Sequence, residues 1–177
     1  MKTLIISYSL TGNNDKLAVG LARSLAAEHV RVRETKPRAM GTIAFDILFN
    51  RTPRVEAPMP ESPEYDLIVF VGPVWMGKIA SPLRSCMRRC RPAVREYAFL
   101  SISGGADGSN PRLEEELKTR LRKRPAAVLD LHIADLLPRE PRPTRDDTSA
   151  YRVSDEDVEV LTDRVVEGLR AANLVST

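Results

Sequence analysis

Five short apolar runs recur along the chain, and each gives way to a stretch of small or polar residues. The runs occupy residues 3–7, 30–33, 66–72, 97–102 and 128–133. The third run is continuously apolar from Leu67 to Val71, which is typical of a strand buried on both faces of a parallel sheet. The second run alternates apolar and basic residues, as a strand with one solvated face does. We therefore predict five strands.

Helical spacing of apolar residues separates these runs. Leucines recur at positions 17, 21 and 25 and again at 113, 117 and 121, and apolar residues at 158, 161, 165 and 169 share one helical face. Asn13, Asn14 or Asp15 is expected to cap the first of these helices. Ser81 and Pro82 are expected to open a basic helix over residues 81–91, since serine caps and proline suits the first turn.

The remaining segments are predicted from the spacing of their apolar residues and from their prolines. Residues 41–50 have apolar positions spaced for a short helix, whereas residues 51–63 contain four prolines and are predicted to be an exposed connection. Residues 138–150 are rich in proline and charge and are predicted to be a loop.

Strands that alternate with helices indicate an α/β fold with a mostly parallel sheet. We expect a single domain over residues 1–177, built as a three-layer α/β/α sandwich with a five-stranded parallel sheet. Right-handed crossovers make 2-1-3-4-5 the natural strand order.

Composition narrows the class of protein. Hydrophobic residues are 42% and charged residues 29% of the chain, which is ordinary for a globular protein. The apolar runs are too short for a membrane span or the core of a signal peptide, so we expect a cytoplasmic protein. Two cysteines cannot form a disulfide framework for a chain of this size.

Charge is unevenly distributed despite a net charge of only +3. Residues 67–95 hold six basic residues and no acidic one. This stretch is either a solvated helix face or a docking surface for an acidic redox partner or for the phosphates of NAD(P)H. We expect no nucleic-acid partner, because no aromatic interleaving accompanies the basic residues. Cys86 and Cys90 are expected to be small buried residues or partly exposed thiols, and the arginines around them could lower a thiol pKa and give some reactivity. His132 is expected to be structural and away from the ligand site.

Three loops should meet at the edge of the sheet where ligands bind, since open α/β sheets bind ligands beyond the carboxyl ends of their strands. The first loop is residues 9–14, the second is residues 73–77 and the third is residues 103–109. All three are rich in glycine, hydroxyl or amide residues. The first loop opens a helix, whose free N–H groups suit a phosphate, although an ordinary strand-to-helix turn would look the same. Trp75, in the second loop, is either a core residue or a ligand contact.

The loop sequences resemble those of flavodoxin-like proteins. Residues 8–18 (YSLTGNNDKLA) are similar to the family's phosphate loop, residues 72–82 (GPVWMGKIASP) to its second flavin loop, and residues 102–105 (ISGG) to its third. The first motif is fairly specific, the second adds to it, and the third alone would be weak. The motifs occur in the family's order, and the resemblance extends over essentially the whole chain.

The resemblance implies a bound FMN. Its phosphate would be held by the first loop, namely Ser9, Leu10, Thr11, Gly12, Asn13 and Asn14. Its ring would lie along Pro73, Val74, Trp75, Met76 and Gly77, with Ser103, Gly104 and Gly105 at the pyrimidine side. The implied roles are electron transfer or NAD(P)H-dependent reduction of a small acceptor such as a quinone, and a porphyrinogen-oxidising role also stays open.

The sequence departs from the family at two positions. Asn14 stands where the family usually has threonine, and its amide can still donate to a phosphate. Asp15 adds a negative charge that would weaken phosphate binding if it pointed inward. The alternative function is a flavodoxin-like binding or regulatory module without flavin. No catalytic side chain and no metal site is identified, and a homodimer is left open.

Overall fold

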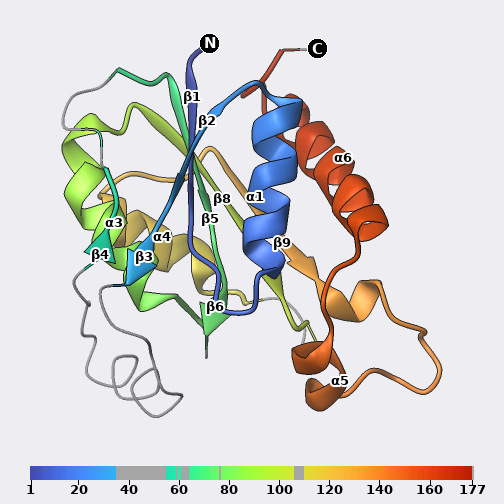
Figure 1. Ribbon diagram of the computed structural model, residues 1–177. Coiled ribbons are helices and arrows are strands. Elements are labelled where there is room, and N and C mark those ends of the chain that lie inside the picture. The colour runs from blue at the N-terminus through green and yellow to red at the C-terminus, as the bar shows by residue number, and fades with distance from the viewer. Residues whose placement is uncertain (35–54, 59, 61–63, 76, 106–109, 177) are drawn as a thin grey trace.

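A five-stranded parallel sheet forms the centre of the molecule (Figure 1). The computed structural model describes residues 1–34, 55–58, 60, 64–75, 77–105 and 110–176. Across the sheet the strands are β2 (Glu28–Arg31), β1 (Thr3–Ser7), β5 (Leu67–Val71), β8 (Glu96–Ser103) and β9 (Ala127–His132). All neighbouring pairs are parallel. In chain order this is 2-1-3-4-5, so the predicted topology is confirmed.

Helices of the described part of the chain cover both faces of the sheet (Figure 1). Helices α1 (Asn13–Ser24) and α6 (Asp155–Ala171) pack on one face, and α3 (Ser81–Cys90) and α4 (Leu113–Leu121) pack on the other. Successive strand residues serve opposite faces: Ile5 joins the core under α1 and α6, and Leu4 and Ile6 join the core under α3 and α4. The predicted three-layer sandwich is therefore confirmed.

The second predicted strand is displaced by two residues. β2 begins at Glu28 because its bounds are set by its pairing with β1. In this pairing Leu4 lies opposite Glu28 and Ser7 lies opposite Arg31. The next residues form β3 (Arg33–Glu34), which pairs antiparallel with β4 (Val55–Glu56). The expected exposed connection over residues 51–63 is thus partly wrong, since it contains β4 and the buried Pro60. The helix expected at residues 41–50 lies outside the described residues.

The predicted loop at residues 138–150 is also partly wrong, because it ends in the short helix α5 (Arg145–Ala150). Thr144 caps this helix: its hydroxyl accepts from the Asp147 N–H, and the Asp147 carboxylate accepts from the Thr144 N–H. The sequence carries this Thr-x-x-Asp box, which is a known helix start. The other short elements of the described residues are the hairpin of β6 (Val74–Trp75) and β7 (Lys78–Ile79), and the 3-10 turns η1 (Arg91–Ala93) and η2 (Ile133–Asp135).

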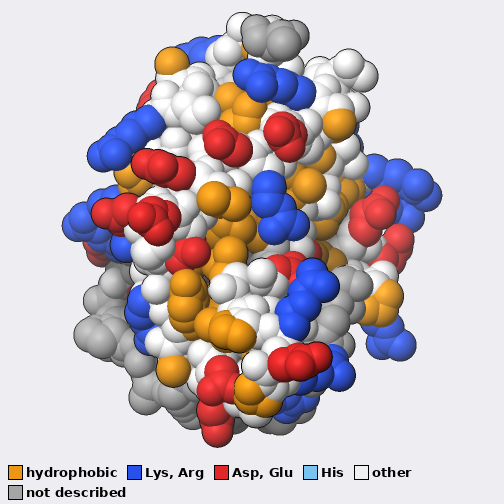
Figure 2. Space-filling model, turned by 90° about the vertical axis from the view of Figure 1, so that its right-hand side faces the viewer, with side chains coloured by type: hydrophobic (Ala, Val, Ile, Leu, Met, Phe, Trp, Pro, Cys, Tyr) orange, Lys and Arg blue, Asp and Glu red, His pale blue; other side chains and the backbone are white. Residues whose placement is uncertain are grey.

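The outer side that carries α6 and α5 mixes both signs of charge. These elements lie on the right of Figure 1, and that side faces the viewer in Figure 2, where red and blue side chains alternate around apolar ones. The charges are therefore interspersed, with no broad field of one sign on this side. Within the described residues, no helix has the length and apolar character needed to cross a bilayer.

Candidate functional site

The carboxyl ends of β1, β5 and β8, with the loops that follow them, form one edge of the sheet, which we call the rim. Because these strands are adjacent and parallel, backbone hydrogen bonds continue beyond them. The Tyr8 N–H donates to the Val71 carbonyl (2.9 Å), and the Gly72 N–H donates to the Leu100 carbonyl (3.0 Å). The first, second and third loops therefore leave the sheet side by side.

The first loop presents hydroxyl groups and the start of α1 to solvent. Thr11 and Gly12 are exposed and Ser9 is partly exposed. The Gly12 N–H donates to the Ser9 hydroxyl oxygen (3.0 Å), so the Ser9 hydroxyl proton is left to donate elsewhere. Gly12 adopts φ +94°, and no atom of the described residues lies within 4 Å of where its Cβ would be. This loop is an open cradle at the positive end of a helix, where first-turn N–H groups have no helical partner.

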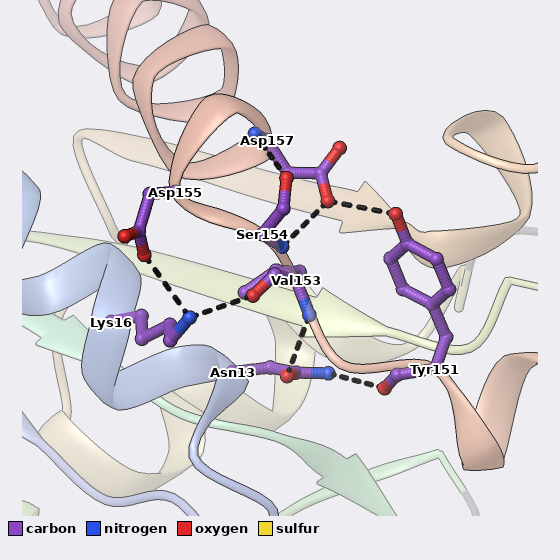
Figure 3. Close-up of polar contacts among 7 residues, drawn as sticks. All are labelled: Asn13, Lys16, Tyr151, Val153, Ser154, Asp155 and Asp157. Atoms are coloured by element: carbon purple, nitrogen blue, oxygen red, sulfur yellow. Dashed lines mark hydrogen bonds and ion pairs between the residues drawn. The ribbon is translucent and has the colours of Figure 1, made fainter.

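The two asparagines of the first loop do not cap α1, contrary to the prediction. The N-cap residue is Gly12, so the helix has no side-chain cap. Asn13 instead reaches the segment before α6, where its amide donates to the Tyr151 carbonyl (3.1 Å) and accepts from the Val153 N–H (3.2 Å) (Figure 3). Both asparagine side chains are buried. Their partners lie about 90 and 140 positions away in the sequence, so the local pattern gave no sign of them.

Asn14 makes the corresponding pair with the end of β8. Its amide N–H donates to the Ile102 carbonyl (3.1 Å), and its amide oxygen accepts from the Ile102 N–H (2.8 Å). The Asn14 amide, which was expected to donate to a phosphate, therefore donates to the backbone of β8.

Charged groups next to the first loop are paired with one another. Arg31 of β2 donates to the Asp15 carboxylate at 2.7 Å, so the negative charge of Asp15 is drawn toward β2 and largely compensated. Lys16 donates to the Val153 carbonyl (2.9 Å) and lies 3.2 Å from Asp155 (Figure 3). The anion-binding capacity of the loop thus rests on hydroxyl and N–H groups.

The second loop is the β6–β7 hairpin, which places Trp75 at the rim. Trp75 is partly exposed and meets Tyr8 edge to face, with ring centroids 5.9 Å apart and planes at 84°. Gly77 turns the hairpin with φ +77°, and the Asn110 amide fixes it by donating to the Gly77 carbonyl (2.6 Å). Trp75 accordingly has one side in the core and another open at the rim. Met76 lies outside the described residues.

Two side chains that the sequence did not place at the site lie directly against the third loop. A Cβ on Gly105 would lie 2.3 Å from the His132 Cβ, and a Cβ on Gly104 would lie 3.0 Å from the Thr148 hydroxyl of α5. His132, expected away from the ligand site, therefore underlies the rim. Its position follows from the register, which places His132 beside Ser103, and its Nε2 lies 3.3 Å from the Asp130 carboxylate.

The basic stretch points mostly away from the rim. Lys78 belongs to the hairpin, but α3 runs from the rim to the opposite edge of the sheet, and Arg88 and Arg89 lie in its last turn. Arg84 is only 1% exposed. The prediction of a solvated helix face is thus wrong for Arg84. Arg88 and Arg89 are exposed, and they lie at the end of α3 that is away from the rim.

Comparison with known proteins gives structural neighbours only. No protein-family model and no curated protein sequence matches the chain. A flavoprotein from Lactobacillus acidophilus NCFM, solved in complex with FMN, is similar with a TM-score of 0.64 at 22% identity, over 73% of this chain and 92% of that one. A Bacteroides uniformis protein assigned as a flavoprotein gives 0.66 at 15% identity, over 92% of this chain and 97% of that one.

A flavodoxin from Streptococcus pneumonia TIGR4 is similar over 97% of this chain and 99% of its own, with a TM-score of 0.50 at 12% identity. At such identities the likeness concerns the fold. The chain has the flavodoxin-like fold, as its loop motifs led us to expect.

Proposed function

We propose that this chain binds FMN non-covalently at the rim and uses it for electron transfer or for the NAD(P)H-dependent reduction of a small acceptor such as a quinone. The observation that carries the proposal is the first loop, which is an open, hydroxyl-lined start of helix α1 beside two further loops rich in glycine. The neighbour with bound FMN has the same fold and supports the assignment.

The first loop fits the phosphate of FMN without a charged side chain. Ser9 and Thr11 would donate their hydroxyl protons to the phosphate. The backbone N–H groups of Leu10, Thr11, Asn13 and Asn14 would point at the same anion, whereas the Gly12 N–H already donates to the Ser9 hydroxyl. The Asp15–Arg31 ion pair removes the repulsion that an inward-facing carboxylate would cause. The side chains of Asn13 and Asn14 are not among these donors, because their amides bond to the protein backbone.

The second and third loops fit an aromatic ring system. Trp75, Pro73 and Val74 offer partly exposed apolar surface, and Gly77, Ser103, Gly104 and Gly105 allow the backbone to approach closely. When bound, FMN would supply one- or two-electron transfer, whereas the chain holds the phosphate and orients the ring. We assign no side chain as a catalytic acid or base.

The phosphate assignment is tested by Thr11→Glu, which places a carboxylate in the cradle. We expect FMN affinity, measured by quenching of flavin fluorescence, to fall on the order of a hundredfold through charge repulsion. Thr119→Glu adds the same charge on an exposed part of α4 far from the rim and should leave affinity unchanged. If Thr11→Glu stays folded and binds FMN as tightly as the wild type, the first loop is not the phosphate site.

The two redox roles separate in a single assay. Protein loaded with FMN is mixed with NADH or NADPH and a quinone, and nicotinamide oxidation is followed by absorbance. Turnover supports a reductase, and its absence with both nucleotides supports an electron carrier. A protein that binds no FMN would support the alternative of a binding or regulatory module.

A further inference from the structure

Asn14 uses both ends of its amide on the backbone of a single residue at the end of β8, next to the third loop. Its nitrogen donates to the Ile102 carbonyl (3.1 Å) and its oxygen accepts from the Ile102 N–H (2.8 Å). The side chain is 3% exposed, and Ile102 directly precedes Ser103 of the third loop. Asn14 therefore bonds to the end of β8 as a neighbouring strand would.

This contact requires a side-chain amide on an arm as short as that of asparagine. It needs one donor and one acceptor about as far apart as those of a peptide group. A threonine at this position has a single hydroxyl on a shorter arm, and an aspartate has no donor. The asparagine that replaces the family's threonine is thus matched to the Ile102 backbone.

We propose that Asn14 is a positioning residue, which ties the first loop to the third and is not itself a ligand of the phosphate. The consequence for cofactor binding rests on the proposed function; the backbone contact does not. Asn14 thereby fixes the position of the start of α1, which would face the phosphate, relative to the third loop, which would approach the flavin ring.

Riboflavin separates a positioning residue from a phosphate ligand, because it has the ring of FMN and lacks the phosphate. Loss of a phosphate ligand weakens FMN binding and leaves riboflavin binding unchanged. Loss of a residue that places the ring loop weakens both by the same factor. The ratio of the two affinities is therefore the quantity to measure.

The experiment compares Asn14→Leu, Asn14→Ser, Ser154→Ala and Thr11→Ala by titration with FMN and with riboflavin. Both Asn14 variants should lower both affinities equally, by about tenfold, since each leaves buried backbone groups of Ile102 unpaired. They should also shift the absorption spectrum and midpoint potential of the bound flavin. Thr11→Ala should lower FMN affinity alone.

Ser154→Ala is the control, because it removes the hydrogen bond between the Ser154 hydroxyl and the Asp157 N–H (3.0 Å) at the start of α6, outside the three loops. It should lower thermal stability and leave the bound flavin's spectrum and potential unchanged. Asn14 variants that weaken FMN and leave riboflavin binding as in the wild type would overturn the proposal and make Asn14 a phosphate ligand.

Hydrogen exchange tests the contact without any flavin. The Ile102 amide should exchange slowly in the wild type and faster in Asn14→Ser, while the Leu100 amide, inside the sheet, stays protected in both. Equal exchange at Ile102 in the two proteins would overturn the contact itself. If the wild type binds neither flavin, the proposed function fails, and this measurement still decides whether Asn14 joins the two loops.

Discussion

Cys86 and Cys90 face the core from one side of α3, and their burial decides their chemistry. Both side chains are fully buried, and the Cys90 thiol donates to the Cys86 carbonyl at 3.0 Å. Burial raises the pKa of each thiol to about 12, which outweighs the opposing effect of Arg89. The expectation of small buried residues is confirmed, despite the arginines around them.

We predict that neither thiol reacts in the folded protein. An aromatic disulfide reagent at mildly alkaline pH should label the chain slowly in buffer and label both cysteines at once in denaturant, because only the exposed thiolate attacks. Labelling of folded protein at the rate of free cysteine would contradict this burial.

Gly105 is the residue whose replacement should cost most stability at the rim. It has φ +75°, and a Cβ there would lie 2.3 Å from that of His132. Gly105→Ala should therefore lower the free energy of unfolding by about 3 kcal/mol or more, from backbone strain and the clash together. Gly12→Ala meets no clash and should cost about 1 kcal/mol from strain alone. Thermal unfolding of the two variants, without added flavin, measures the difference, and equal losses would be inconsistent with His132 lying under Gly105.

The residues of the rim show what sequence could and could not predict. The glycine and hydroxyl residues of the first loop are visible in the sequence, and the structure exposes Thr11 and Gly12 at the start of α1; their role in binding a phosphate stays a proposal. The side chains of Asn13 and Asn14 point inward because their hydrogen-bond partners lie on distant elements. In the same way, His132 comes to lie beneath Gly105 from a strand far along the chain. Those partners become neighbours only through the strand register, which local patterns do not specify.

At the scale of elements, the start of α6 is fixed by reciprocal hydrogen bonds. The Ser154 hydroxyl accepts from the Asp157 N–H (3.0 Å), and the Asp157 carboxylate accepts from the Ser154 N–H and the Tyr151 hydroxyl, both at 2.8 Å (Figure 3). Burial alone would raise the pKa of Asp157, but the hydrogen bonds from Ser154 and Tyr151 together outweigh it and hold this pKa below its usual value.

A lowered carboxyl pKa links the stability of α6 to pH. The contribution of Asp157 is present above about pH 4, the pKa of an unfolded aspartate, and is lost as pH falls through the lowered folded value. Thermal midpoints of the wild type should therefore fall more steeply below about pH 5 than those of Asp157→Asn. Glu156→Gln removes one charge from the same turn and serves as the control. Parallel pH profiles for the wild type and Asp157→Asn would contradict the role of these hydrogen bonds.

Elements with a strong internal pattern were predictable, and elements that depend on a partner were not. The buried strand at Leu67–Val71 and the leucine-spaced helices appear where their periodicity places them. β2 is shifted because its bounds follow β1, and β3 and β4 form only through each other. α5 was missed although its capping box is visible in the sequence, because prolines dominate the residues before it.

At the scale of the whole molecule, topology decides which charges can act at the rim. The strand order 2-1-3-4-5 places the first three loops together and sends the end of α3, with Arg88 and Arg89, to the opposite edge. A partner docked on these arginines would contact the far edge and leave the rim open. The proposed NAD(P)H or redox partner is therefore better sought at the rim itself, near Lys78 and α5.

The most direct test of the account is a titration of the purified 177-residue chain with FMN, followed by the fluorescence of both the flavin and Trp75. Trp75 is the only tryptophan, so its emission reports on the second loop alone. We predict saturation at one FMN per chain, with flavin and tryptophan emission quenched together because the ring lies against the rim. Absence of binding, or binding that leaves Trp75 emission unchanged, would contradict FMN at this site.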